Sequence, residues 1–164
     1  MQSGKDESGN AVAVAIRRAR EADAPTLVEF NCRMARETEH KTLDAILVAQ
    51  GVAAVFANPA RGFYLVAERE EKVVAQLMIT FEWSDWRNST FWWIQSVYVH
   101  EDARRSGIFR TMYREVERLA RAAGNVVGLR LYVEKDNVRA QLTYESLGMP
   151  NAGYVVHEVT FESR

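Results

Sequence analysis

A strand–helix–strand pattern in the second half of the chain most narrows the folds open to it. Residues 90–99 have the composition of a strand, and residues 107–123 form a strongly amphipathic helical pattern that ends at a glycine. Residues 126–133 are then nearly continuously apolar, which is typical of a strand covered on both faces. This order predicts a β-α-β unit, and therefore an α/β fold.

The first half adds strands that are expected to pair antiparallel. Residues 12–17 read as a first strand, and a helix is expected to begin at a capping Asp23 with Pro25 in its first turn. A second helix is predicted over residues 43–56. The residues expected to face inward from it are Leu43, Ile46, Leu47 and Val52, or residues near them.

Two further strands, residues 62–68 and 72–83, are predicted around a charged turn. After the β-α-β unit, a last helix is expected over residues 137–147 and a last strand over residues 154–161. The predicted order is β-α-α-β-β-β-α-β-α-β in a mixed central sheet. Residues 1–11 are predicted to be a disordered tail, and residues 12–164 a single domain.

Composition limits the classes of function. The 164 residues carry 21 basic and 22 acidic side chains, a net charge of -1, which argues against a dedicated nucleic-acid-binding protein. Cys32 is the one cysteine, so no intrachain disulfide forms, and we expect a cytoplasmic protein. No apolar run approaches the roughly 18 residues of a membrane span. We expect the protein to bind no membrane, nucleic acid or metal.

The segment from Val97 to Arg110 carries the chemistry. A strand ends, a short polar loop with several arginines follows, and a helix begins at Gly107. The N-terminus of a helix presents backbone N–H groups that suit a pyrophosphate, and glycine lets the ligand approach closely. The alternative is a solvated basic loop that caps an ordinary β-α unit. Neither a Walker loop nor a G-x-G-x-x-G dinucleotide motif is present.

Residues 104–109 resemble the acetyl-CoA loop Q/R-x-x-G-x-G/A of the GNAT N-acetyltransferases, with Phe109 at the last small position. Residues 131–149 resemble the strand–helix segment of the same family, with Asn137, Ala140, Tyr144 and Gly148 in place. The resemblance spans about residues 13–161 and implies acetyl-CoA as acyl donor. The residues it assigns to acetyl-CoA are Val97, Tyr98, Val99, Arg104, Arg105, Ser106, Gly107, Ile108, Phe109, Arg110 and Asn137.

The same resemblance implies catalytic roles. Tyr144 matches the general acid of the family, and the alternative for Tyr144 is a core tyrosine with a satisfied hydroxyl. Gln95 stands where many relatives carry a glutamate base, and an amide cannot accept a proton at neutral pH. Glu82 and Asp85 are the nearest acidic substitutes, although each also reads as an exposed hairpin charge. The catalytic candidates are therefore Tyr144, Glu82 and Gln95.

Acceptor recognition is predicted at the hairpin tip. Trp83, Asp85 and Trp86 place indole faces beside acidic groups, an arrangement that can hold a cationic amine. Trp92 and Trp93 are expected to pack on either side of the sheet. Residues 37–40 are expected to supply the opposite wall of the acceptor site. The segment 81–99 resembles that of diamine and polyamine acetyltransferases.

These observations predict an acetyl-CoA-dependent N-acetyltransferase acting on a primary amine of a small, cationic molecule. Two alternatives stay open: a protein lysine or N-terminal acetyltransferase, and a non-catalytic acyl-CoA-binding regulatory domain, which Gln95 and Phe109 would suit. A homodimer is also expected, as in many relatives.

Overall fold

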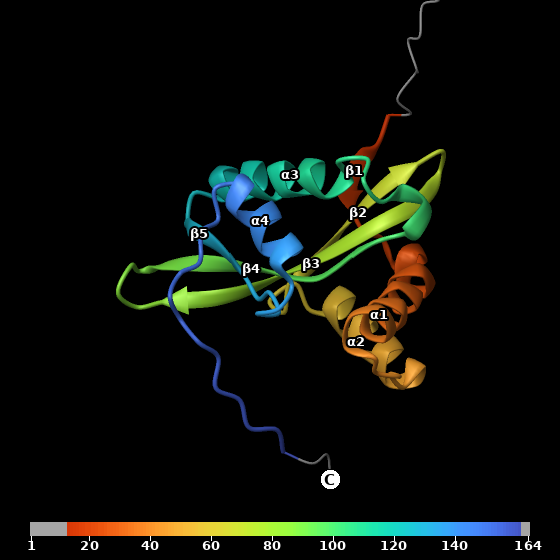
Figure 1. The fold of residues 1–164 in the computed structure, drawn as a ribbon, viewed down its shortest axis with the longest axis horizontal. Helices are drawn as coiled ribbons and strands as arrows, with labels where there is room; N and C mark the ends of the chain where they lie inside the picture. Colours follow the sequence, from red (N-terminus) through yellow and green to blue (C-terminus); the bar gives the residue numbers. More distant parts are fainter. Residues whose placement is uncertain (1–12, 162–164) are drawn as a thin grey trace, which may run out of the picture. The chain divides into compact units, whose positions relative to one another are not determined.

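The computed structural model describes residues 13–161 (Figure 1), so the predicted tail at residues 1–11 lies outside the described part of the chain. The chain divides into two compact units, Met1–Tyr132 and Val133–Arg164. The first unit holds the sheet and three α-helices, and the second holds one short helix.

The sheet has five strands in the order β1-β2-β3-β4-β5, which is also their order along the chain. The first four are antiparallel neighbours, and β5 lies parallel to β4 after a helical crossover. This confirms the α/β class and the mixed sheet, with the parallel pair in the β-α-β unit. The strands are β1 (Ala15–Arg18), β2 (Phe63–Arg69), β3 (Lys72–Ser84), β4 (Ser89–Val99) and β5 (Val126–Leu131).

Helices α1 (Ala24–Glu39) and α2 (Ala45–Ala57) cover one face of this sheet, and α3 (Ile108–Ala123) covers the other (Figure 1). The α1/α2 face is sealed by a core cluster of Leu27, Val52, Tyr64 and Val66, each at most 5% exposed. Strand residues that alternate with Tyr64 and Val66, such as the paired Leu65 and Leu77, point to the α3 face. Trp92 and Trp93 point to opposite faces, as predicted.

The inward face of α2 differs from the predicted one. Ile46 and Leu47 are 72% and 64% exposed, Leu43 precedes the helix, and only Val52 of the four predicted residues is buried. Partly buried Val48, Val55 and Phe56 complete the inward stripe. The helix is apolar almost all round, so the hydrophobic pattern does not single out one face.

Asp23 also differs from expectation. Its carboxylate does not cap α1, although Asp23 stands at the N-cap position. Instead it accepts hydrogen bonds from the Arg17 guanidinium at 2.7 and 3.0 Å and from the backbone N–H of Arg20 at 2.7 Å. The side chain is drawn to β1 because a charged partner offers stronger hydrogen bonds than the helix N–H groups.

The second unit contains α4 (Val138–Ser146). Asn137 caps this helix, because its side-chain oxygen accepts the N–H of Ala140 at 3.1 Å. The predicted last strand is not formed: residues 154–161 make no regular element, and their apolar side chains, such as Tyr154 and Phe161, are more than 80% exposed. Residues 154–161 have strand propensity, but propensity alone does not form a strand, which also needs a partner for its hydrogen-bond ladder.

Candidate active site

Strands β4 and β5 separate midway along β4. Their parallel pairing runs from Thr90 with Val126 to Ile94 with Leu131, where β5 ends. β4 continues through Gln95 to Val99 while still paired to β3 on its other side. Along this stretch, no strand of the described residues pairs with the β5 side of β4. The free edge is suited to an extended ligand that bonds to backbone groups as a strand would.

A β-bulge marks the start of this free edge. The register between β3 and β4 shifts between the pairs Met78–Gln95 and Gln76–Tyr98, and Ser96 has a positive φ of 50°. The buried Gln76 amide donates to the Ser96 carbonyl at 3.2 Å and to the Asn31 side chain on α1 at 2.9 Å. Side chains of β3 and α1 therefore hold the bulge in place.

The loop after β4 presents backbone donors at the start of α3. Arg105 and Gly107 both have a positive φ, 64° and 77°, and Gly107 is the N-cap of the helix. The first intrahelical bond is donated by Thr111 to the Gly107 carbonyl at 3.1 Å. The start of a helix presents backbone N–H groups, so the geometry of this loop is suited to an anion. A Cβ on Gly107 would meet no atom within 4 Å, so the space above it is open.

The side chains of this loop divide into anchors and exposed groups. Ile108 is 3% exposed and anchors the helix in the core, and the Ser106 hydroxyl donates to the Ala103 carbonyl at 2.6 Å. Phe109 is half-buried, while Arg105 and Arg110 are exposed. Ile108 can thus meet a ligand only through its backbone, and the two arginines are placed to add positive charge.

Arg104 is held by protein groups on two sides. Its Nε donates to the Val99 carbonyl at 2.9 Å, and its Nη2 donates to the Glu37 carboxylate at 2.5 Å. The other oxygen of Glu37 accepts the Tyr98 hydroxyl at 2.9 Å. The pKa of Glu37 is lowered, chiefly by Arg104, and that of Tyr98 is raised, first by burial. The Tyr98 side chain therefore belongs to the contact with α1, and only its backbone can face a cofactor.

A polar floor extends from Gln95 along the α1/α2 face. Gln95 Nε2 donates to the Thr80 hydroxyl at 2.6 Å. Farther along, one Glu82 oxygen accepts the Arg130 guanidinium at 2.6 Å and the other accepts the indole N–H of Trp93. We call Gln95, Thr80, Glu82, Arg130 and Trp93 the polar floor. Glu82 is an ion-paired group here, so its carboxylate is not an unoccupied base.

Aromatic rings surround the polar floor. The Trp93 ring stacks on Tyr132 with centroids 4.4 Å apart, and the Arg130 guanidinium lies 3.7 Å from the Phe91 centroid. Arg130 and Thr80 were not among the predicted site residues. Arg130 carries a detectable signal, because it is the one charged side chain in the apolar run that forms β5.

The predicted acceptor residues are separated from this floor. Trp83 pairs with Thr90 and lies on the face of β3 opposite Glu82, with its side chain 61% exposed. Trp86 is 94% exposed at the hairpin tip, where its backbone N–H donates to the Asp85 carboxylate at 2.9 Å. The structure brings Gln95 and Glu82 to one face, and it does not bring Trp83, Asp85 or Trp86 to them.

The two predicted site residues of the second unit can be described within that unit. Asn137 uses its side-chain oxygen as the cap of α4, and its contact with acetyl-CoA stays a prediction. Tyr144 lies in the same helix, and burial raises the pKa of its hydroxyl above the usual 10. At neutral pH this hydroxyl keeps its proton, which is the form that a general acid needs.

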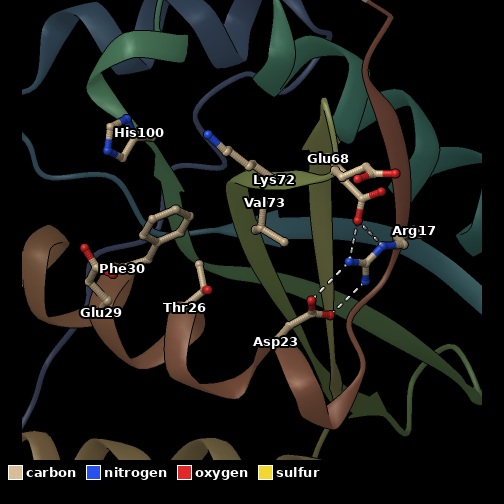
Figure 2. A pocket seen from close by; sticks show the side chains of 10 residues that line it. Arg17, Asp23, Thr26, Glu29, Phe30, Glu68, Lys72, Val73 and His100 are labelled. Carbon is tan, nitrogen blue, oxygen red and sulfur yellow. Dashed lines mark hydrogen bonds and ion pairs between the residues drawn. The ribbon is translucent and has the colours of Figure 1, made fainter.

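A cavity of about 460 Å³ lies elsewhere in the first unit, between α1 and the β2–β3 end of the sheet (Figure 2). Figure 2 shows the Arg17 guanidinium held between Asp23 and Glu68 on its wall, with ion pairs of 2.7 Å to each. None of the residues predicted for acetyl-CoA or catalysis lines it. The residues that do are Arg17, Asp23, Thr26, Glu29, Phe30, Glu68, Glu71, Lys72, Val73 and His100.

A free strand edge at a bulge, followed by the start of a helix, is an arrangement suited to an extended phosphorylated ligand, as expected for acetyl-CoA. Residues 25–149 match the acetyltransferase (GNAT) family, and the chain belongs to this family. It is an acetyl-CoA-dependent acetyltransferase. No curated protein sequence is significantly similar to the chain.

Solved structures agree with this assignment. A possible acetyltransferase from Clostridium difficile 630 is 45% identical, with a TM-score of 0.86 over 92% of this chain and 99% of that chain. A predicted acetyltransferase with acetyl-CoA from Clostridium acetobutylicum shares the fold at 18% identity, with a TM-score of 0.74 over 90% of this chain and 96% of that one. None of the helices in residues 13–161 has the length and apolar character needed to cross a membrane.

Proposed function

We propose that this acetyltransferase modifies the primary amine of a small, cationic molecule. The observation that carries the proposal is the position of Gln95. Gln95 directly precedes the bulge where the free edge of β4 begins, and its side chain is the end of the polar floor nearest to that bulge. An acetyl thioester bound along that edge and an amine bound on the floor would meet at this point.

The floor offers the amine no carboxylate that is free of an ion pair. The Gln95 amide cannot take a proton, and both Glu82 oxygens already accept hydrogen bonds from Arg130 and Trp93. The ammonium group of the substrate therefore loses its proton to water before attack. Gln95 and the Thr80 hydroxyl orient the neutral amine through hydrogen bonds.

The chain supplies two further groups to the reaction. Backbone N–H groups at the bulge around Val97 are suited to stabilise the oxyanion that forms on the acetyl carbonyl. Tyr144 supplies the proton that the departing CoA thiolate takes up, in keeping with its family position and its raised pKa. The N–H groups of the loop from Arg105 to Ile108 hold the pyrophosphate.

The charge and aromatic character of the floor support a cationic acceptor. A carboxylate has about four lone-pair positions, so Glu82 can accept from a substrate ammonium in addition to Arg130 and Trp93. The Trp93 and Tyr132 rings offer faces for a cation. The likeness of segment 81–99 to diamine and polyamine acetyltransferases points to the same class.

Amine-dependent release of CoA from acetyl-CoA tests this proposal. The panel contains a monoamine, a diamine, polyamines, a zwitterionic amino acid, and peptides bearing a lysine or a free N-terminus. We expect turnover with diamines or polyamines and a KM that rises in Glu82→Gln. Turnover with the peptides alone would assign a protein acetyltransferase instead. Acetyl-CoA binding without turnover of any amine would favour the non-catalytic alternative.

A further inference from the structure

A three-residue network joins the end of α1 to the proposed acetyl-CoA loop. Glu37, in the last turn of α1, has its two carboxylate oxygens divided between the Tyr98 hydroxyl on β4 and the Arg104 guanidinium in the loop. Arg104 in turn reaches back to the Val99 carbonyl at the end of β4. We call Glu37, Tyr98 and Arg104 the Glu37 network.

We infer that Glu37 is a positioning residue for acetyl-CoA. Glu37 holds Arg104 across the end of the free β4 edge and so fixes the pyrophosphate loop to α1. This inference rests on the proposed site along β4. It assigns Glu37 no contact with the reacting atoms. Its effect passes through Arg104 and Tyr98.

The geometry of Arg104 supports positioning rather than competition. A guanidinium has five N–H donors in a rigid fork. The bonds to Val99 and Glu37 use Nε and Nη2, so neither of these two bonds occupies Nη1. Arg104 can therefore donate to a phosphate oxygen while Glu37 holds it. The Tyr98 ring, 4% exposed, gives the network a rigid base.

The Glu37 network also links the proposed acetyl-CoA site to α1, which contacts the proposed acceptor side. Asn31 and Gln76 tie α1 to the bulge, and Glu37 ties the end of α1 to the loop, so one helix contacts both ends of the free β4 edge. Residues 37–40, which were predicted to form a wall of the acceptor site, comprise the last residues of α1 and its C-cap, His40. Loosening the Glu37 network is therefore expected to act on donor binding first, and on the amine through α1.

Glu37→Gln tests the inference, with Glu117→Gln as the matched control. Glu117 lies in α3 and pairs with Arg121 at 2.6 Å, so its substitution removes the same charge and breaks a Glu–Arg pair without touching the loop. In Glu37→Gln we expect the KM for acetyl-CoA to rise about tenfold, within the usual range of coupling between sites. The kcat should stay within about twofold, and thermal unfolding without ligand should match that of the control.

A charge exchange provides the second variant. Glu37→Arg combined with Arg104→Glu restores the pair with reversed polarity, and we expect it to unfold like the wild type without ligand but to bind acetyl-CoA weakly, because a carboxylate then faces the phosphates. Equal KM values for acetyl-CoA in Glu37→Gln and Glu117→Gln would overturn the inference. A lower KM in Glu37→Gln would overturn it too, because Glu37 would then compete with the phosphates for Arg104. Failure of the wild type itself to bind acetyl-CoA would refute the proposed site instead.

Discussion

Gln95 and Tyr98 lie on the same face of β4 although they are three residues apart. In a regular strand this spacing would place them on opposite faces. The bulge at Ser96 inserts one residue, so Gln95 turns toward Thr80 while Tyr98 still reaches Glu37 on α1. The bulge therefore places the candidate acceptor floor and the α1 contact on one side of the sheet, beside the free strand edge.

Gly107 and Gly124 allow a matched test of the loop. Both are glycines at an end of α3 with a φ near +75°, 77° and 73°, and a Cβ on either would meet no atom within 4 Å. Valine at either position should cost about 1–2 kcal/mol of stability, because the left-handed conformation is strained for it. Only Gly107→Val should also weaken acetyl-CoA binding, by at least about tenfold.

Isothermal titration of both glycine variants with acetyl-CoA checks this difference. Unfolding in urea measures whether the two lose similar stability. Equal dissociation constants for Gly107→Val and Gly124→Val would place the phosphates away from the start of α3.

Gln95→Glu should convert the amide position into a general base. The new carboxylate lies beside the Thr80 hydroxyl and can take the proton of the amine. Because a positioned base contributes about 10²–10⁴-fold, kcat/KM at pH 7 should rise by at least about tenfold. Gln95→Ala is the control and should lower kcat/KM only modestly. A Gln95→Glu enzyme no faster than Gln95→Ala would show that Gln95 does not adjoin the amine.

Tyr144→Phe should lower kcat by about 100-fold if the hydroxyl protonates the leaving thiolate. Burial raises the pKa of Tyr144, so the wild-type hydroxyl is protonated throughout the neutral range and its loss is felt there. The phenylalanine keeps the ring, and the KM for acetyl-CoA should change little. Steady-state kinetics from pH 6 to pH 9 measure both constants, and an unchanged kcat would leave Tyr144 as a packing residue.

Asp23→Asn should lower the free energy of unfolding at pH 7 by about 1.5–3 kcal/mol, the usual value for hydrogen bonds to charged groups. Arg17 lowers the pKa of Asp23 below 3.8, so the folded state favours the carboxylate. That stabilisation is present above the unfolded pKa and is lost as the pH falls through the folded pKa. Urea unfolding from pH 7 to pH 3 should therefore show the variant and wild type converging in acid. A constant difference would contradict this reading.

The fold could be predicted where the hydrophobic pattern is periodic and bounded. The three central strands and α3 form within one or two residues of the predicted ends, because alternation and terminal glycines mark them. The inward face of α2 could not, since Ile46 and Leu47 are as apolar as Val52. The last strand also failed, because its formation depends on a partner strand and not on the propensity of residues 154–161 alone.

The candidate site was only partly readable from the sequence. The loop at Gly107 and the position of Gln95 follow from local motifs. The ion pairs of Glu37 with Arg104 and of Glu82 with Arg130 join residues 67 and 48 positions apart, so no local pattern reveals them. Trp83 and Glu82 point to opposite faces because neighbouring residues of a strand alternate. The predicted acceptor site followed the residue types of the hairpin and not this alternation.

Thermal unfolding with and without acetyl-CoA tests the central claim most directly, namely that acetyl-CoA binds along β4 and at the start of α3. A ligand at a hundredfold its Kd stabilises the native state by about 2.7 kcal/mol, and each kcal/mol moves Tm by roughly 2–4 °C in a domain of this size. We predict a rise of about 5–10 °C for the wild type and, because Gly107→Val binds at least about tenfold more weakly, a rise of no more than about half that size for the variant. An unchanged Tm of the wild type at millimolar acetyl-CoA would contradict the account.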